Sequence, residues 1–246
     1  MFDFSGQRVI VTGGTRGIGA GISRAFLQAG ATVIATYASD NASANDFKNK
    51  NEQYSQKLDI QKYDVSSSQE VKDFFKYLDQ KYPSLEVLVN NSGIRQDSLM
   101  ALMTDEQWQK VLAVNLNGTF YMSREIISRF MANHFGRIIN INSLGGDIGF
   151  QGQSNYAASK AGQFALARSL SKEVAKKGIT VNCVAPGFID TELISDLPEE
   201  QKKEYLRMIP LRRFGKVEEV ACAVLFLASR DASYITGTSI KVAGGL

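Results

Sequence analysis

The sequence predicts a single doubly wound α/β domain, with a seven-stranded parallel sheet and helices on both of its faces. Short β-branched runs alternate with longer helical patterns along the whole chain. The runs at residues 87–89 and 138–139 are apolar without alternation, as expected where both faces of a sheet are covered. A glycine-rich turn joins the first run to the first helical pattern.

The elements follow in order from these patterns. Runs rich in Val, Ile and Thr predict strands at residues 8–12, 32–36, 56–64, 87–90, 136–141, 179–184 and 235–242. Helical periodicity predicts helices at residues 18–28, 68–81, 105–131, 156–177 and 217–227. The fourth helix ends on Lys176 and Lys177 before Gly178, which suits a helix C-terminus. The polar stretch 39–56 is expected to be a surface helix or loop. No linker or repeat divides the chain, so we expect one domain over residues 1–246.

Composition narrows the class of protein. The 28 basic and 25 acidic residues nearly balance, so neither nucleic acid nor an anionic membrane is expected as a partner. The N-terminus has no secretion signal, and no apolar run approaches the ~18 residues of a membrane span, which indicates a cytoplasmic protein. Cys183 and Cys222 lie in apolar stretches without metal-ligand spacing. We expect two buried thiols and no metal site.

The turn after the first strand has the spacing Gly-x-x-x-Gly-x-Gly. Glycines at this position let a pyrophosphate approach the backbone at a helix N-terminus, which predicts a Rossmann-type dinucleotide site. The spacing differs from the commoner Gly-x-Gly-x-x-Gly, and tight packing alone is the alternative reading of these glycines. The turn residues expected at the cofactor are Gly13, Thr15, Arg16, Gly17, Ile18 and Gly19.

The end of the second strand bears on the choice between NAD and NADP. An acid there would bind the ribose hydroxyls and repel a 2′-phosphate, but Thr36 and Tyr37 occupy the position. Asp40 lies a few residues beyond, in a loop that a bend would bring to the ribose. Arg16 offers a cation for the phosphate. The sequence therefore favours NADP(H).

A phenol and an ammonium, Tyr156 and Lys160, stand at i and i+4 on a predicted helix. A nearby cation stabilises phenolate and lowers the pKa of a group that ordinarily titrates near ~10. Such a pair suits proton transfer near neutral pH. A surface Tyr and Lys one turn apart is the alternative.

Several short motifs together resemble the short-chain dehydrogenase/reductase family over essentially the whole chain. They are Thr12-Gly13-x-x-x-Gly17-x-Gly19, Asn90-Asn91-Ser92-Gly93, Asn115, Ser143, Tyr156-x-x-x-Lys160 and Pro186-Gly187. The resemblance implies that Tyr156 donates the proton, Lys160 holds the nicotinamide ribose and Ser143 stabilises the substrate oxygen. It also implies that Asn115 keeps a water in a proton relay toward Lys160.

The same resemblance implies further cofactor contacts. Asp64 and Val65 would lie at the adenine, and Ile189 and Thr191 would follow Pro186-Gly187 at the nicotinamide. The segment Asn91, Ser92 and Gly93 would meet the adenosine ribose. The family usually has alanine at Ser92 and Asp or Asn at Ala243, which leaves the packing of the C-terminal loop open.

Within the family, the sequence resembles most the bacterial 3-oxoacyl-[acyl-carrier-protein] reductases, through stretches such as 89–97, 152–162, 178–191 and 234–237. The implied reaction is NADPH-dependent reduction of a 3-oxoacyl thioester to the (3R)-3-hydroxyacyl thioester in fatty acid or related lipid or polyketide biosynthesis. The alternatives are an alcohol, sugar or steroid dehydrogenase and, more remotely, a non-catalytic dinucleotide-binding protein.

Partners follow from that resemblance. An acidic acyl-carrier protein would need exposed cations, for which Arg95, Arg137, Lys176 and Lys177 are candidates, each with a solvated surface charge as the alternative. His134 stands where related reductases carry a stronger cation. The helices at 105–131 and 156–177 resemble a subunit interface, which implies a homotetramer. Residues 188–213 read as an amphipathic lid over the substrate, with Phe150 and Phe188 as candidate pocket residues.

Overall fold

The computed structural model describes residues 2–195 and 198–246, and it confirms the predicted fold class. Its seven strands form one all-parallel sheet in the order β3-β2-β1-β4-β5-β6-β7. The order reverses between β1 and β4, which lie side by side. At such a point the loops at the carboxyl ends of the two strands separate and leave room for a ligand. The strands are β1 (Arg8–Val11), β2 (Thr32–Tyr37), β3 (Leu58–Lys62), β4 (Val87–Asn90), β5 (Gly136–Ile141), β6 (Ile179–Pro186) and β7 (Ser239–Val242).

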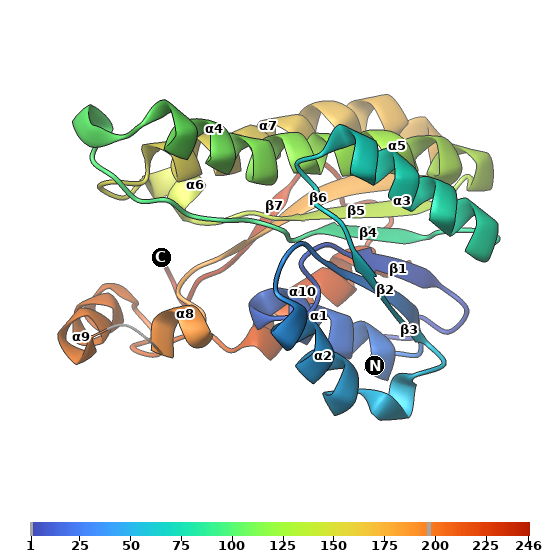
Figure 1. Cartoon of the computed structure of the whole chain (residues 1–246), viewed down its shortest axis with the longest axis horizontal. Helices are drawn as coiled ribbons and strands as arrows, with labels where there is room; N and C mark the ends of the chain where they lie inside the picture. The colour runs from blue at the N-terminus through green and yellow to red at the C-terminus, as the bar shows by residue number, and fades with distance from the viewer. Residues whose placement is uncertain (1, 196–197) are drawn as a thin grey trace.

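Helices cover both faces of the sheet (Figure 1). One face carries α1 (Gly17–Gln28), α2 (Asn41–Lys50) and α10 (Val217–Ala228). The other carries α3 (Ser68–Lys81), α4 (Asp105–Leu112), α5 (Gly118–Asn133) and α7 (Ser154–Val174). The short α6 (Gly145–Ile148), α8 (Glu192–Ser195) and α9 (Glu199–Met208) lie beyond the carboxyl ends of the strands. Single turns complete the chain: η1 (Glu52–Tyr54), η2 (Met100–Leu102), the π-helical η3 (Ala113–Asn117) and η4 (Ala175–Lys177).

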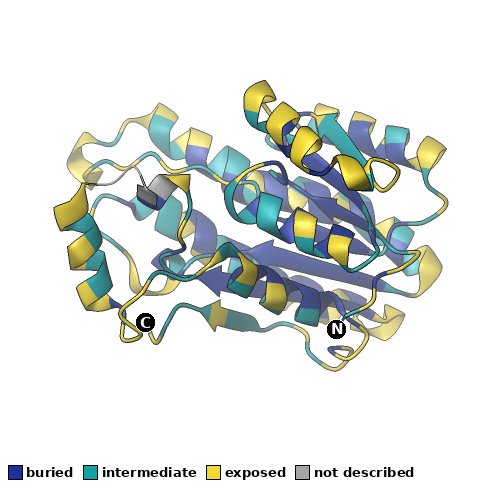
Figure 2. Ribbon diagram, turned by 90° about the horizontal axis from the view of Figure 1, so that it is seen from below, coloured by how far each residue is buried: buried dark blue, intermediate teal, exposed yellow. Residues whose placement is uncertain are grey.

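The sheet divides the apolar interior into two clusters. Successive strand residues point to opposite faces, so Val9 and Val11 pack with α1 and α10, whereas Ile10 packs with α3 and α5. All three side chains are fully buried. Figure 2 shows the buried strands between helices whose outward faces are exposed. A sheet buried on both faces explains the continuous apolar runs of the sequence.

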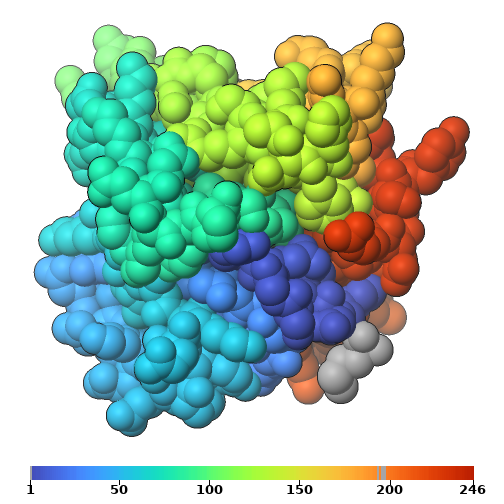
Figure 3. All heavy atoms as spheres, turned by 90° about the vertical axis from the view of Figure 1, so that its right-hand side faces the viewer, coloured from blue at the N-terminus to red at the C-terminus, as the bar shows by residue number. Residues whose placement is uncertain are grey.

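The amino edge of the sheet is closed by a buried arginine. Arg137 is 3% exposed and donates hydrogen bonds to the carbonyls of Gly136, Gly178 and Ser229. Its burial, together with the charge of Arg230, lowers its pKa to about 10. The expectation that Arg137 is a docking cation is therefore wrong, because its guanidinium does not reach the surface. Figure 3 views this side and shows the dark blue N-terminal segment beside the red C-terminal part of the chain.

Most predicted elements shift by a few residues at their ends, and three change more substantially. The helix expected over 105–131 is interrupted at η3, and α5 then ends at His134, whose φ is +48°. The strand expected over 235–242 begins only at Ser239, because Gly237 has a φ of +74°, which no strand residue adopts. The strand expected over 56–64 shortens to β3, since Lys57 closes a turn onto Tyr54.

The two cysteines also differ from expectation. Cys183 on β6 is buried as predicted, whereas Cys222 on α10 is exposed. Within residues 2–195 and 198–246, no helix is long and apolar enough to cross a bilayer and no cluster of candidate metal ligands occurs.

Candidate active site

The glycine turn forms a cradle at the N-terminus of α1. Gly13 and Gly17 adopt positive φ values of +61° and +51°. A Cβ on Gly19 would lie 2.0 Å from the Gly13 carbonyl oxygen, so only glycine fits there. The first turn of α1 has no acidic residue and no side-chain cap, which leaves its backbone N–H groups for an anion. These features fit the pyrophosphate of a dinucleotide.

The threonine before this turn ties it to the loop after β4. The Thr12 hydroxyl accepts hydrogen bonds from the backbone N–H groups of Asn91 and Ser92, at 2.9 and 3.0 Å. The Asn91 amide donates to the carbonyls of Thr12 and Gly13, at 2.9 and 3.0 Å. The structure thus brings the predicted glycine-turn and Asn91–Gly93 residues together across the point where strand order reverses.

The carboxyl end of β2 lies beside the glycine turn. Thr36 is buried and its carbonyl accepts a hydrogen bond from the Gly14 N–H, and Tyr37 follows it. The Arg16 guanidinium lies 3.6 Å from the Asp40 carboxylate. Asp40 is the N-cap of α2, and its bonds from Ser43 hold the pKa of that carboxyl below its usual range. Asp40 thus lies beside Arg16 at the carboxyl end of β2.

The remaining predicted cofactor residues lie at the ends of β3 and β6. Asp64 follows β3 and accepts hydrogen bonds from the Ser66 N–H and hydroxyl, at 2.8 and 2.7 Å, so its carboxylate is already used in a turn. Val65 packs closely against Gly118 at the start of α5, where an added Cβ on the glycine would lie 2.9 Å from the valine side chain. The segment after β6 contains Gly187, bonded to the Val242 carbonyl, then Ile189 and Thr191, whose hydroxyl donates to the Ile189 carbonyl.

The predicted reacting residues converge at the carboxyl end of β5. Tyr156 lies in the first turn of α7, and Ser143 follows β5 with its hydroxyl close to the Tyr156 side chain. Lys160 lies one turn further along α7, with Nζ 5.7 Å from the centroid of the Tyr156 ring. Burial raises the pKa of the Tyr156 phenol, while the Ser143 hydroxyl and the charge of Arg95 offset part of that rise.

Lys160 is buried in a fixed set of contacts. Its Nζ donates to the Ile141 carbonyl at 2.8 Å and to Gln163 Oε1 at 3.1 Å. Burial lowers the pKa of Lys160 to about 8. The Gln163 amide in turn donates to the carbonyl of Asn115 at 2.7 Å. A protein side chain therefore bridges Lys160 and the Asn115 carbonyl.

Asn115 belongs to the π-helical segment η3. Its side chain accepts from the Ile94 N–H at 2.8 Å and donates to the Ile94 carbonyl and the Ser159 hydroxyl. It thus fastens the loop after β4 to α7. A Cβ on Gly93, in that loop, would lie 3.6 Å from Lys160 Nζ. Asn115 and Gly93 accordingly lie beside the reacting pair.

Arg95 stands over the catalytic candidate Tyr156. Its guanidinium carbon is 6.0 Å from the ring centroid, and it forms an ion pair with Asp97. Asp97 accepts a hydrogen bond from Gln153, the N-cap of α7, and the Ser98 N–H donates to the carbonyl of Gly152. These bonds hold the 95–98 loop against the first turn of α7. Arg95 is thus part of the site, where the sequence had suggested only a docking cation.

Aromatic side chains connect the expected lid to the site. The rings of Phe188 and Tyr205 stack with centroids 4.3 Å apart, and Phe150 meets Phe188 at 6.0 Å. The contact joins α9 to the loop after α6, close to Ser143 in sequence. Ile194 and Ile209 of the same segment are buried. Residues 196 and 197 of the expected lid lie outside the described residues.

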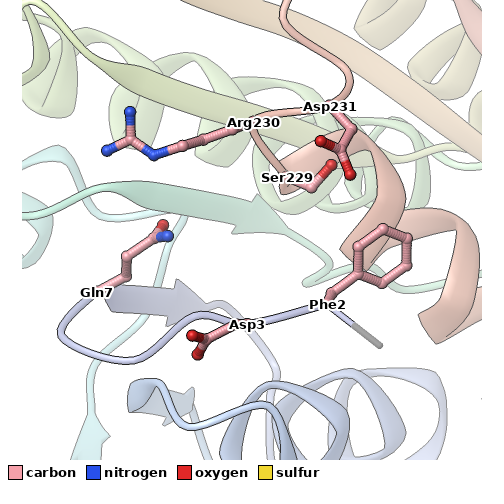
Figure 4. Close-up of a pocket in the computed structure, with 6 residues that line it drawn as sticks. All are labelled: Phe2, Asp3, Gln7, Ser229, Arg230 and Asp231. Carbon is pink, nitrogen blue, oxygen red and sulfur yellow. The ribbon is translucent and has the colours of Figure 1, made fainter.

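A separate pocket of about 340 Å³ lies at the opposite edge of the sheet (Figure 4). Phe2, Asp3 and Gln7 precede β1, and they face Ser229, Arg230 and Asp231, which follow α10. Because Gln7 precedes the amino end of β1, this pocket is remote from the residues gathered at the carboxyl ends.

Comparison with known proteins identifies the class to which this site belongs. A family profile described as "Enoyl-(Acyl carrier protein) reductase" matches residues 13–246, which is most of the chain. The chain belongs to the short-chain dehydrogenase/reductase family. It is accordingly an oxidoreductase acting on CH–OH and C=O groups, in a family that binds a nicotinamide dinucleotide.

Individual relatives cover nearly the full length of this short-chain dehydrogenase/reductase. The chain is 43% identical over 237 residues to the acetoacetyl-CoA reductase of Rhizobium meliloti, with 96% of each protein covered. It is 40% identical over 245 residues to a 3-oxoacyl-[acyl-carrier-protein] reductase of Salmonella typhimurium, with 99% of this chain and 98% of the relative covered. A reductase of the same name from Thermotoga maritima is 41% identical over 241 residues, covering 98% of both.

Sequence reasoning missed two residues of this short-chain dehydrogenase/reductase site. Gln163 lies seven residues after Tyr156, on the same helical face, a spacing that was available as a signal. Arg95 was noted for its charge alone, because nothing in the sequence shows that the loop folds back onto α7.

Proposed function

We propose that this protein reduces a 3-oxoacyl thioester to the (3R)-3-hydroxyacyl thioester, with NADPH as the reductant. The observation that carries the proposal is the convergence of Ser143, Tyr156 and Lys160 beside the glycine cradle. Two of the relatives, by their names, act on acetoacetyl-CoA and on 3-oxoacyl groups of acyl-carrier protein. Both substrates are 3-oxoacyl thioesters.

The donor set fits a nicotinamide dinucleotide. The N–H groups at the start of α1 suit its pyrophosphate, and the small residues of the turn leave space for it. Arg16 carries the charge for a 2′-phosphate, and its contact with Asp40 would give way to that phosphate. The other contacts that we propose are Thr15, Ile18, Thr36, Tyr37, Asp64, Val65, Asn91, Ser92, Gly93, Pro186, Gly187, Ile189 and Thr191. When bound, the reduced nicotinamide supplies the hydride.

The chain's own residues move the proton. As negative charge grows on the substrate oxygen, Tyr156 donates its phenolic proton to that oxygen and Ser143 donates a hydrogen bond to it. The Lys160 ammonium, held by Ile141 and Gln163, keeps one further N–H for the cofactor ribose and stabilises the phenolate that Tyr156 becomes. Asn115 holds the Ile94 loop and Ser159 in place around these groups.

The segment 188–213 is proposed to cover the acyl chain. Phe188, stacked on Tyr205 and touching Phe150, gives this segment an aromatic cluster that joins it to the loop after α6. Closing this segment over the thioester would exclude water from the reacting carbonyl and strengthen the hydrogen bonds to its oxygen.

We further propose a homotetramer that docks an acyl-carrier protein. Exposed Leu99, Met100, Leu102 and Phe120 lie on and beside the α4–α5 layer and favour burial against another subunit. Exposed Lys176 and Lys177 lie about 20 residues along the helical axis from Tyr156, or roughly 30 Å. They would therefore serve the active site of a neighbouring subunit better than their own. Light scattering that gives a monomer would remove this part of the proposal.

The first experiment follows oxidation of NADPH and, separately, of NADH, with an acetoacetyl group on coenzyme A and on acyl-carrier protein. We expect turnover with NADPH and faster turnover on the carrier protein. Faster turnover on coenzyme A would retain the reaction and overturn the carrier. Failure of both thioesters, in protein that still binds NADPH, would overturn the substrate class.

A further inference from the structure

Gln163 is a fully buried carboxamide at the reacting centre. It lies on α7 three residues after Lys160 and seven after Tyr156, which places the three side chains on one face of the helix. Nothing in the proposed chemistry requires a polar residue there, and an apolar side chain would be the ordinary choice for a position with 0% exposure.

Every polar atom of the Gln163 side chain has a partner. Its Oε1 accepts from Lys160 Nζ at 3.1 Å. Its Nε2 donates to the Asn115 carbonyl and to the Thr119 hydroxyl, each at 2.7 Å. The Thr119 hydroxyl donates to the same Asn115 carbonyl at 2.7 Å, which fixes the orientation of the amide. The amide therefore cannot turn without leaving a buried group unbonded.

The Asn115 carbonyl that accepts these bonds lies in the π-helical segment η3. A π turn widens the helix, and such segments concentrate at functional sites. Thus η3 supplies the Asn115 carbonyl, and α7 supplies the Gln163 amide, which bonds both that carbonyl and the Lys160 ammonium.

We infer that Gln163 is a positioning residue, which ties the Lys160 ammonium to the Asn115 carbonyl and so directs the remaining N–H of Lys160 to the side of Tyr156. A carboxamide holds geometry but exchanges no acid–base proton near neutral pH, so Gln163 acts on Lys160 and not on the substrate. This inference rests on the proposed function of Lys160.

The charge state of Lys160 depends on few groups. Among the described residues, the titratable groups facing it are Tyr156 on α7 and Cys183 on β6, whose pKa burial raises to about 12. β5 contributes the neutral Ile141 carbonyl to the Lys160 ammonium, and Gln163 links that ammonium to η3 and α5. Arg95 and Asp97 act on Tyr156 from the loop after β4. Removing the Gln163 acceptor therefore takes away one of two hydrogen bonds that favour the charged amine.

The test compares Gln163→Met, which keeps the volume and removes the acceptor, with Gln163→Glu, which adds an anion at the same distance. The matched control is Thr119→Val, which removes a partner of Gln163 but leaves its contact with Lys160. The readout is the pKa of Lys160 in protein without cofactor, from ¹³C NMR of the labelled lysine side chains. The alkaline limb of the pH profile for kcat is measured in parallel.

We expect Gln163→Met to lower the Lys160 pKa of about 8 by about one unit, and therefore to lower kcat at pH 8 by about 5-fold. Gln163→Glu should raise the pKa, and Thr119→Val should leave it unchanged. A Lys160 pKa that stays constant in both Gln163 variants, or that moves equally in Thr119→Val, would overturn the inference. If Gln163→Met does not fold, the Glu variant decides alone. The NMR measurement of the Lys160 pKa needs no turnover. Failure of the thioester assay would therefore contradict the proposed substrate without affecting the conclusion about Gln163.

Discussion

The ion pair between Arg95 and Asp97 should set the pH at which Tyr156 works. Arg95 lowers the pKa of the phenol and Asp97 raises it. Replacing Arg95 by Gln removes a cation 6.0 Å from the ring, whereas replacing Asp97 by Asn removes the opposing anion. The two substitutions should therefore shift the Tyr156 pKa in opposite directions.

The size of this effect follows from the distance. Two unit charges about 6 Å apart interact by about 3 kcal/mol at an effective dielectric constant of 20 and by about 0.7 kcal/mol in bulk water. The Arg95 side chain is 39% exposed and Asp97 partly cancels its charge, so the lower value applies. About 0.7 kcal/mol corresponds to about half a pKa unit.

The assay is the pH dependence of kcat/KM for oxidation of a 3-hydroxyacyl thioester, in which the phenolate accepts a proton. Because the rate rises with pH through the Tyr156 pKa, Arg95→Gln should move the midpoint up by about half a unit and Asp97→Asn should move it down. Shifts in the same direction, or no shift in either variant, would refute the electrostatic reasoning. A change in the plateau alone would indicate an effect on substrate binding instead.

Three further predictions concern the cofactor and the proton. Tyr156→Phe should keep NADPH affinity, measured by nucleotide fluorescence, and lose nearly all turnover, and substantial residual activity would contradict its role as donor. Arg16→Ala should weaken NADPH binding by about 10-fold and change NADH binding little, and Asp40→Asn should strengthen NADPH binding. Calorimetry measures both affinities. Equal effects on the two nucleotides would exclude recognition of the 2′-phosphate by Arg16. Gly19→Ala should abolish dinucleotide binding, since its Cβ would meet the Gly13 oxygen at 2.0 Å, whereas Gly6→Ala, at a positive φ with no atom within 4 Å of the added Cβ, should retain it.

The elements that follow local patterns were predictable. The Lys176-Lys177-Gly178 ending is confirmed, because Gly178 has a left-handed φ of +70° after η4. The alternation of strands and helices along the chain and the position of the glycine turn also follow from periodicity and spacing. These features depend on neighbouring residues, so a sequence records them directly.

What depends on distant contacts was not predictable. Arg137 reads as a surface cation, yet it is buried and donates to the carbonyls of Gly178 and Ser229, 41 and 92 residues further along the chain. The spacing of Gln163 from Tyr156 places it on the reacting face of α7, but its partners come from η3 and α5, some 45 residues earlier, and the sequence does not show those contacts. The interruption of the helix at η3 has no proline or glycine within it to announce it.

The π-helical segment η3 makes the site sensitive to the length of the chain. A π turn holds more residues than an α turn, so deleting one residue from 113–117 would allow α4 and α5 to merge into a continuous α-helix. Because a π turn takes up an extra residue over nearly the same rotation as an α turn, the deletion would leave the buried face of α5, including Met122 and Phe130, close to its present orientation. The deletion would therefore spare the packing of α5 and remove the widened turn that holds Asn115 beside the reacting centre.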